Sequence, residues 1–427
     1  MKKRIPSLVL ALALIVSLMA ACAPQPAQVG TAPNEEGTNE AGTREVVLTM
    51  GSWRTDDVDQ MNALLAEYKT VAPNVTINFR PTNPPDYNAT LRLQLDGGTG
   101  PDLMYARSYA TGQELFKEGF FADCSDIPGL KDNFTASNLE PWQMPDGKMF
   151  AVPFAAVSHA VYYNKDIFSA NNVAVPKTWS EFMDVCKTLK NNGVTPFANG
   201  VADEWDILEC FFLGMLPNYV GGAEQRALFE KGERKFTDQA IVDAFTDLAM
   251  VSGYMPNGFE AVTYDDSMAL FESGRAAMFV DGSWTCGVYS DAAFEWGLFA
   301  VPARNANDTA ICFHPDMAIT MNAATGHPDE CRAFLQWLCS QAGATTASKA
   351  LPLGFFPMIK FSIALDDPHA NEFLALNEGK QTDARFVWPA MMGLYKPMND
   401  AVIEVLRGSI TPQQAAEKVE ASPRTSD

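Results

Sequence analysis

The sequence is poor in the residues and motifs on which catalytic sites and metal centres usually depend. It has only four histidines, and none of its eight cysteines belongs to a C-x-x-C pair. The motifs G-x-S-x-G, H-E-x-x-H, G-x-x-x-x-G-K-[ST] and G-x-G-x-x-G are all absent from the sequence. We therefore expect a protein that is not an enzyme and that holds neither a cofactor nor a metal ion.

A secreted glycan-active enzyme is the alternative, since two carboxylates can act together as acid and base on a glycosidic bond. The acidic pairs Asp56/Asp57 and Asp265/Asp266 are the candidates. Residues that are adjacent in one chain rarely lie on opposite sides of a substrate bond. The sequence therefore favours a binding protein over an enzyme.

Basic residues are in the minority as well, with 31 Lys and Arg against 52 Asp and Glu and a formal net charge of −21. Phosphate backbones would be repelled, which argues against a nucleic-acid partner.

A chain of 427 residues suits two domains better than one core. Apart from Cys22, the cysteines are expected to be mostly buried apolar groups, and one or two disulfide bonds among them are possible.

The N-terminal residues are typical of a secretory signal. Residues 2–4 are basic and residues 8–19 are almost entirely apolar, a run too short for a membrane-spanning helix. The two alanines before Cys22 resemble a bacterial lipobox, which implies a lipid on Cys22, although Met19 stands where leucine is favoured. Cleavage at an A-x-A site is the alternative. Residues 23–44 contain no aromatic residue and should form a flexible linker.

From residue 45 onward, strand and helix patterns alternate. The runs 45–53, 75–80 and 101–107 are expected strands, and helical patterns lie between them. This order predicts a parallel α/β sheet. Further helices are expected at 178–193, 206–216, 239–252, 327–341 and within 401–420, and further strands at 148–164, 276–280, 296–303 and 314–321.

Several phrases, taken in order, resemble one family. They are PDLMYARS (101–108), DGKMFAVPF (146–154), VYYNKDIF (161–168), PKTWSEF (176–182), FESGRAAMFVDGSW (271–284) and TPQQAAEKV (411–419). The chain from about Glu45 to its C-terminus is therefore similar to the extracellular solute-binding proteins (family 1) of ABC importers, of the maltose-binding type.

The resemblance implies an α/β, periplasmic-binding-protein-like fold, in which two discontinuous lobes are joined by a hinge around a central ligand cleft. Lobe 1 would comprise 45–155 and 297–345, and lobe 2 would comprise 156–296 and 346–427. The chain would cross between the lobes near residues 153–157, 296–302 and 345–351.

The function implied is that of a monomer, lipid-anchored outside the cell membrane, which captures a mono- or oligosaccharide and delivers it to an ABC permease. The same fold could instead take iron, a polyamine or a phosphate ester.

Sugar rings have apolar faces and a rim of hydroxyls, so aromatic side chains and bidentate polar groups are the candidates for binding them. Trp284 and Asp281 lie at the end of the expected strand 276–280, and the resemblance implies that Trp284 stacks on a sugar. The remaining candidates are Trp53 and Arg54 after the first strand, Arg107 and Tyr109 after the third, Trp205 before a helix, and Trp388 near the C-terminus. For each of these, packing or a surface ion pair is the alternative. Tyr162 and Tyr163 are expected to be core residues, not an iron site.

Overall fold

The computed structural model describes residues 44–203, 205–360, 365, 367–383 and 391–424. The expected signal sequence with Cys22, the linker up to residue 43, and Trp388 lie outside the described residues. In the part of the chain that is described, no helix is both long enough and apolar enough to cross a membrane. The description below concerns the compact unit Val46–Asp427.

The N-terminal part follows the predicted alternation of strands and helices. Strand β1 pairs in parallel with β2 on one side and with β3 on the other, as an α/β sheet requires. The elements are β1 (Val46–Ser52), α1 (Val58–Val71), β2 (Val75–Pro81), α2 (Pro84–Asp96), β3 (Leu103–Ala106), α3 (Tyr109–Lys117), α4 (Leu130–Asn133) and α5 (Ala136–Leu139).

The middle of the chain forms a second set of helices and strands. Its elements are β4 (Val152–Asn164), α6 (Lys165–Ala170), α7 (Trp179–Asn191), β5 (Thr195–Phe197), the π-helix η2 (Asp206–Phe212), α8 (Leu213–Met215), α9 (Pro217–Val220), α10 (Ala223–Glu230), α11 (Gln239–Val251), α12 (Tyr264–Glu272), β6 (Ala276–Gly282) and β7 (Trp296–Phe299). Helix α7 begins where expected, because the Thr178 side chain accepts a hydrogen bond from the backbone N–H of Glu181.

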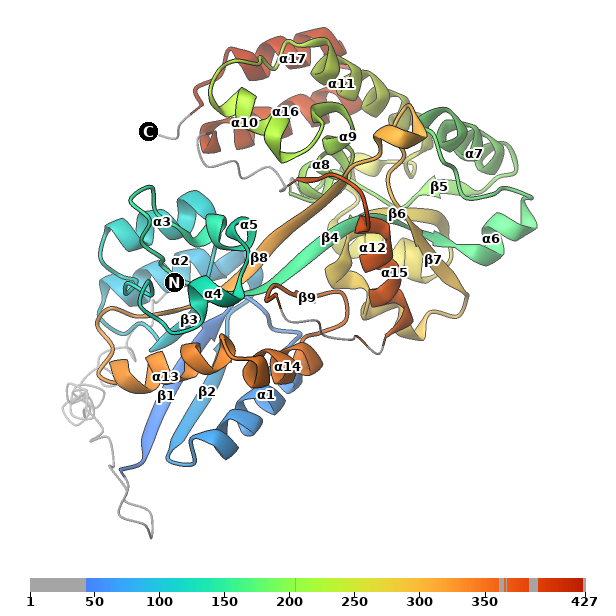
Figure 1. The fold of residues 1–427 in the computed structure, drawn as a ribbon. Coiled ribbons are helices and arrows are strands. Elements are labelled where there is room, and N and C mark those ends of the chain that lie inside the picture. Colours follow the sequence, from blue (N-terminus) through green and yellow to red (C-terminus); the bar gives the residue numbers. More distant parts are fainter. Residues whose placement is uncertain (1–43, 204, 361–364, 366, 384–390, 425–427) are drawn as a thin grey trace, which may run out of the picture. The chain divides into compact units, whose positions relative to one another are not determined.

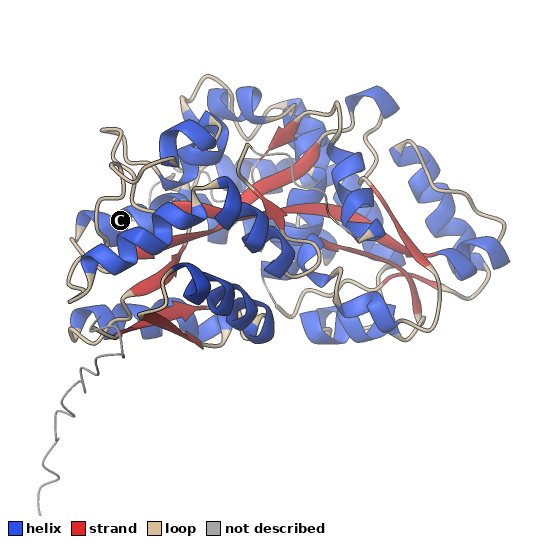
Figure 2. Cartoon of the chain, turned by 60° about the horizontal axis from the view of Figure 1, so that its bottom comes forward, coloured by secondary structure: helices blue, strands red, loops and turns tan. Residues whose placement is uncertain are grey.

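The C-terminal part returns to both sets. Its elements are β8 (Ile311–Met321), α13 (Pro328–Leu338), α14 (Gln341–Ala350), β9 (Phe356–Pro357), α15 (Pro368–Asn377), β10 (Thr382–Asp383), α16 (Tyr395–Leu406) and α17 (Pro412–Glu420). The strands run in the order β2-β1-β3-β8-β4-β6-β5, with β10 paired to β8 and with β7 and β9 paired to β4. In Figure 2 helices lie on both sides of these strands.

Two long strands connect the hydrophobic cores. The first core is formed by buried residues from within 46–157 and 317–358, the second from within 161–301 and 391–419, and the third from within 160–373. Strands β4 and β8 pair antiparallel and run side by side (Figure 1). Strand β4 has buried residues in all three cores, whereas β8 has buried residues in the first core and packs Phe313 against the third. Two separate large cores joined by a strand pair are the packing expected of a two-lobe α/β fold.

The packing of β7 and β8 bears on one of the expected crossings between the lobes. Leu298, Phe299 and Val301 pack in the second and third cores, whereas Met317 and Ile319 of β8 pack in the first. Among the described strands β7 pairs with β4 alone, so the chain reaches the first core by way of β8. The division into lobes at residue 297 stays a proposal, and this packing favours a division within β8.

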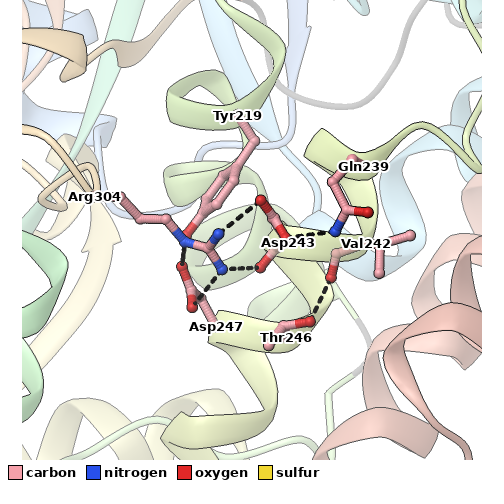
Figure 3. Close-up of polar contacts among 7 residues, drawn as sticks. All are labelled: Tyr219, Gln239, Val242, Asp243, Thr246, Asp247 and Arg304. Atoms are coloured by element: carbon pink, nitrogen blue, oxygen red, sulfur yellow. Dashed lines mark hydrogen bonds and ion pairs between the residues drawn. The ribbon is translucent and has the colours of Figure 1, made fainter.

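A guanidinium fork ties the segment after β7 to helix α11. Arg304 Nε and Nη2 donate to the two carboxylate oxygens of Asp247 at 2.7 and 3.0 Å, and Nη1 lies 2.6 Å from Asp243 Oδ2 (Figure 3). The Tyr219 hydroxyl donates to the same carboxylate of Asp247 at 2.6 Å. Because the Asp247 side chain is only 5% exposed, this network satisfies a charge that would otherwise be buried without compensation.

No disulfide forms among the seven cysteines in the described ranges, and all seven are buried. The expectation of buried thiols is therefore confirmed for these cysteines.

Candidate functional site

Trp284 lies where strand β6 ends, and its ring is held by a hydrogen-bond relay. Its Nε1–H donates to the Tyr264 hydroxyl at 2.7 Å, and that hydroxyl donates to Asp281 Oδ2 at 2.9 Å. Thr285 Oγ1 donates to the same oxygen at 2.9 Å. The relay fixes the orientation of the Trp284 ring, which is half-buried, so that part of the ring remains uncovered.

Four rings gather around this relay, and we call them the aromatic cluster: His159, Trp205, Tyr264 and Trp284. The ring centroids of Trp205 and Tyr264 are 4.5 Å apart, and those of Trp205 and Trp284 are 6.4 Å apart. His159 meets Trp284 edge-on, at 5.2 Å and 85°. Both tryptophans are half-buried, so the cluster presents apolar ring surface that is not fully enclosed.

Asp281 is fully buried, and burial raises its pKa to about 7. Burial also raises the pKa of Asp206, which begins the π-helix η2, well above its ordinary value, and the neighbouring Asp281 charge adds to this effect. A covered carboxyl group cannot meet a ligand in this conformation. Any contribution of Asp281 to binding would therefore be indirect, through Tyr264.

Trp53 and Arg107 lie together at the carboxyl ends of β1 and β3. The Arg107 guanidinium stacks over the Trp53 indole, 3.7 Å from the ring centroid. Trp53 is buried and its ring meets Tyr87 and Tyr105 edge-on. Of the two predicted site residues, Arg107 is the one with exposed surface, and Trp53 supports it.

Arg54 is engaged by a carboxylate and by an aromatic ring. Its Nε and Nη2 donate to the two oxygens of Asp57 at 2.6 and 2.7 Å, and its guanidinium lies 4.8 Å from the Phe355 ring centroid. Burial by itself would lower the pKa of Arg54, but the hydrogen bonds and charge of Asp57 outweigh it and raise the pKa. An anionic ligand would therefore have to compete with Asp57 for this cation.

Phe355 also brings the Arg54 region close to Trp284. Gly354, which precedes Phe355, accepts a hydrogen bond from Ser283 Oγ, and Ser283 precedes Trp284. Trp284 itself packs against the first core. The structure thus places Arg54 and Trp284, predicted from segments far apart in the sequence, at the two ends of one chain of contacts.

Tyr109 is buried at the start of helix α3, two residues after Arg107. It begins helix α3 at a φ of 55°, which is uncommon for a side chain other than glycine, and only 4% of it is exposed. Burial raises the pKa of its hydroxyl, and the charges of Glu140, Arg226 and Asp383 act on it. Tyr109 therefore lies near charged groups that include Arg226 of α10 and Asp383 of β10.

A cavity of about 120 Å³ lies beside Arg107, lined by residues of α2, β3 and α3 such as Tyr87, Asn88 and Glu114. None of its lining residues belongs to the aromatic cluster. The cavity is smaller than the 300–1,000 Å³ typical of pockets for drug-sized ligands. It therefore does not replace the cluster as the candidate binding surface.

Sequence reasoning missed Tyr264 and three residues of the crossing strands. Tyr264 begins α12, 20 residues before Trp284. Nothing in the sequence links the two residues until the packing of α12 beside β6 is known.

His159, Cys312 and His314 lie with their ligand atoms within 4.8 Å of one another. The C-x-H spacing of Cys312 and His314 was the available signal, since residues two apart in a strand share a face.

Tyr162 is in a core position, as expected, whereas Tyr163 is half-buried and packs against the second core. Tyr162 is fully buried and its hydroxyl donates to the carbonyl of Gly282 at 2.9 Å, whereas Tyr163 packs on Phe168 and Phe299.

Comparison with known proteins identifies similar chains. The model of one family, described as a bacterial extracellular solute-binding protein, matches residues 63–375. The chain is 26% identical over 359 residues to an uncharacterized ABC transporter extracellular-binding protein of Pyrococcus horikoshii, covering 79% of each. It is 23% identical over 384 residues to the maltotriose-binding protein of Pyrococcus abyssi, covering 86% of this chain and 79% of that protein.

A solved structure shows the same fold. The bacterial solute receptor AcbH, described with an exclusive substrate preference for β-D-galactopyranose, superposes with a TM-score of 0.77 at 17% identity. The match covers 88% of this chain and 98% of that one.

Proposed function

Because the chain belongs to the family of bacterial extracellular solute-binding proteins, we propose that it captures a carbohydrate outside the membrane for an ABC importer. The family places it on the extracytoplasmic side. The name of one relative, a maltotriose-binding protein, supports the class of cargo. The name of another, an ABC transporter extracellular-binding protein, supports the link to an ABC importer. The cargo would be a mono- or oligosaccharide.

The observation that carries the proposal is the aromatic cluster. Trp205 and Trp284 are half-buried rings, and the faces of such rings stack on the C–H faces of pyranoses. Trp284 already donates its only N–H to Tyr264, so its contribution to binding would come from its ring face. Charged or phosphorylated cargo would need cations available to it, and the Arg54 fork is occupied by Asp57.

Binding would favour a conformation in which both lobes contact the sugar, because a ligand stabilises the state that it contacts more extensively. The Phe355 segment would assist, since it already joins the Arg54 region to Ser283 and Trp284. The permease would then recognise the closed protein. A lipid on Cys22 and a flexible linker up to residue 44 would keep the monomer close to that permease.

We do not attribute catalysis to this protein. The family consists of binding proteins, and the carboxyl groups of Asp206 and Asp281, next to the aromatic cluster, are at most 1% exposed and so are closed to a substrate.

Calorimetric titration of the purified protein with neutral mono-, di- and oligosaccharides, uronates, polyamines, glycerol phosphate and ferric iron tests the proposal. We expect saturable binding of at least one neutral saccharide without turnover. Binding of iron, polyamine or phosphate ester alone, or hydrolysis of a glycan, would refute it.

Trp284→Ala should weaken the saccharide about 3- to 10-fold, because a well-placed aromatic contact contributes on the order of 1 kcal/mol. The matched control is Trp337→Ala in α13, another half-buried tryptophan, which packs on Tyr68 and Phe334 in the first core. Full affinity in Trp284→Ala, or an equal loss in the control, would remove Trp284 from the site.

A further inference from the structure

Strands β4 and β8 bring two imidazoles and a thiol together at the place where the strands connect the cores. His159 comes from β4, and Cys312 and His314 come from β8. Their ligand atoms lie within 4.8 Å of one another, and each of the three residues is at most 2% exposed. We call this group the crossing triad.

The strand register explains why the three side chains share one face. Val157 pairs with His314 and Ser158 pairs with Phe313 in the antiparallel β4–β8 ladder. The ladder ends at this pair, and one further step in the same direction would bring His159 opposite Cys312. Residues two apart in a strand point to the same side, which agrees with the observed proximity of both β8 donors to His159.

The tautomer of His314 is suited to binding a cation. Its Nδ1 lies 3.1 Å from the carbonyl oxygen of Pro315, which can only accept a hydrogen bond. Nδ1 therefore carries the proton, and Nε2 keeps its lone pair. A histidine whose second nitrogen donates to a backbone carbonyl is the usual arrangement of a metal ligand.

We propose that the crossing triad binds one zinc-like cation through His159, Cys312 and His314. Imidazole nitrogen and thiolate sulfur are the preferred donors for Zn²⁺, whereas Mg²⁺ and Ca²⁺ require oxygen ligands, which the triad does not supply. Zn–N and Zn–S distances of about 2.0–2.3 Å place tetrahedral ligands roughly 3.3–3.7 Å apart, so small side-chain rotations suffice to close the triad. Three protein ligands leave the fourth position for water.

The site would tie the hinge strands together. Its ligands come from both strands that join the cores, so a bound cation would cross-link β4 and β8. It would also fix His159, whose ring meets Trp284 at 5.2 Å. The metal site shares His159 with the aromatic cluster, but it can be tested separately from sugar binding, because Cys312 and His314 do not belong to that cluster.

Titration of the reduced, chelator-treated full chain with Zn²⁺ tests the site, with cobalt absorption as a second readout. We expect one equivalent to bind, with release of the thiol proton to the buffer, and Co²⁺ to show a thiolate-to-metal charge-transfer band. Cys312→Ala should abolish that band and weaken Zn²⁺ about 100-fold or more, and His314→Gln should weaken Zn²⁺ about 10- to 100-fold while retaining the band.

Cys186→Ala is the matched control, since Cys186 is a buried thiol of α7 in the second core. It should keep both the stoichiometry and the cobalt band. Circular dichroism of each variant establishes that the protein is folded. The proposal is overturned if the wild-type chain binds no stoichiometric Zn²⁺, or if Cys312→Ala binds it as tightly as Cys186→Ala.

Discussion

Asp281 should make the stability of this protein fall as the pH rises from about 4 to about 7, and Asp281→Asn should remove that fall. The carboxyl group is fully buried, and burial raises its pKa to about 7 from an ordinary value of 3.8. Its Oδ2 accepts from Tyr264 and Thr285. An asparagine oxygen can accept both bonds, so the variant resembles the protonated carboxylic acid.

The sign follows from proton binding. Between about pH 4 and pH 7 the folded protein keeps the proton on Asp281, whereas the unfolded chain has lost it. Stability falls with pH wherever the folded state binds more protons, so the contribution of this group is complete below the unfolded pKa and is lost as the pH approaches 7. A shift of about three units corresponds to about 4 kcal/mol, at 1.36 kcal/mol for each unit.

Urea unfolding, followed by circular dichroism from pH 4.5 to pH 8, measures the effect. Subtraction of the wild-type curve from the Asp281→Asn curve cancels the groups whose titration the substitution leaves unchanged. As the pH rises through this window, the free energy of unfolding of the variant should increase relative to that of the wild type by up to about 4 kcal/mol. Asp265→Asn, an exposed position on α12, should give a curve parallel to the wild type.

Parallel curves for the wild type and Asp281→Asn would refute this reasoning, because they would mean that Asp281 is ionised in the folded protein at all these pH values. An Asp281→Asn variant whose free energy of unfolding falls relative to that of the wild type as the pH rises would refute it as well.

Two further substitutions test how the fold positions the site. Arg304→Ala should lower the free energy of unfolding by about 1–3 kcal/mol in urea titrations, because it leaves the nearly buried Asp247 without its cation. Arg304→Lys should recover only part of this stability, since lysine cannot donate to both oxygens of Asp247 as the guanidinium does. Gly354→Ala should lower the free energy of unfolding by about 2–4 kcal/mol, because its φ is +86° and a Cβ would lie 1.7 Å from the Ser283 carbonyl oxygen. Gly379→Ala should lower it by about 1 kcal/mol, because φ is +69° there but no atom lies within 4 Å of the added Cβ. Equal losses in the two glycine variants would show that the Ser283 contact is not rigid.

The secondary structure could be predicted because its signals are local. The strand–helix alternation of the N-terminal part and the Thr178 cap depend on neighbours within a few residues, and the structure has them where expected. The packing of β8 against the first core could not be predicted in the same way. Its position depends on which strand pairs with β4, and a strand pattern in the sequence carries no information about its partner.

The candidate site could be predicted only in part for the same reason. Trp284 and Trp205 could be proposed from their places after a strand and before a helix, and in the structure their ring centroids lie 6.4 Å apart. Tyr264 could not be proposed, because its role depends on how α12 packs beside β6. Cys312 and His314 form a readable C-x-H pair, yet only the β4–β8 register adds His159 to them.

The relay behind Trp284 determines what kind of contact this ring can offer. Its N–H donates to Tyr264, whose hydroxyl donates to Asp281, so the only hydrogen-bonding atom of the indole is used inside the protein. The ring can therefore contribute stacking area and not hydroxyl selectivity. Discrimination between sugars that differ in one hydroxyl must come from polar groups elsewhere. Arg107 is the predicted polar residue that combines exposed surface with a fixed position, because its guanidinium stacks over Trp53 at 3.7 Å.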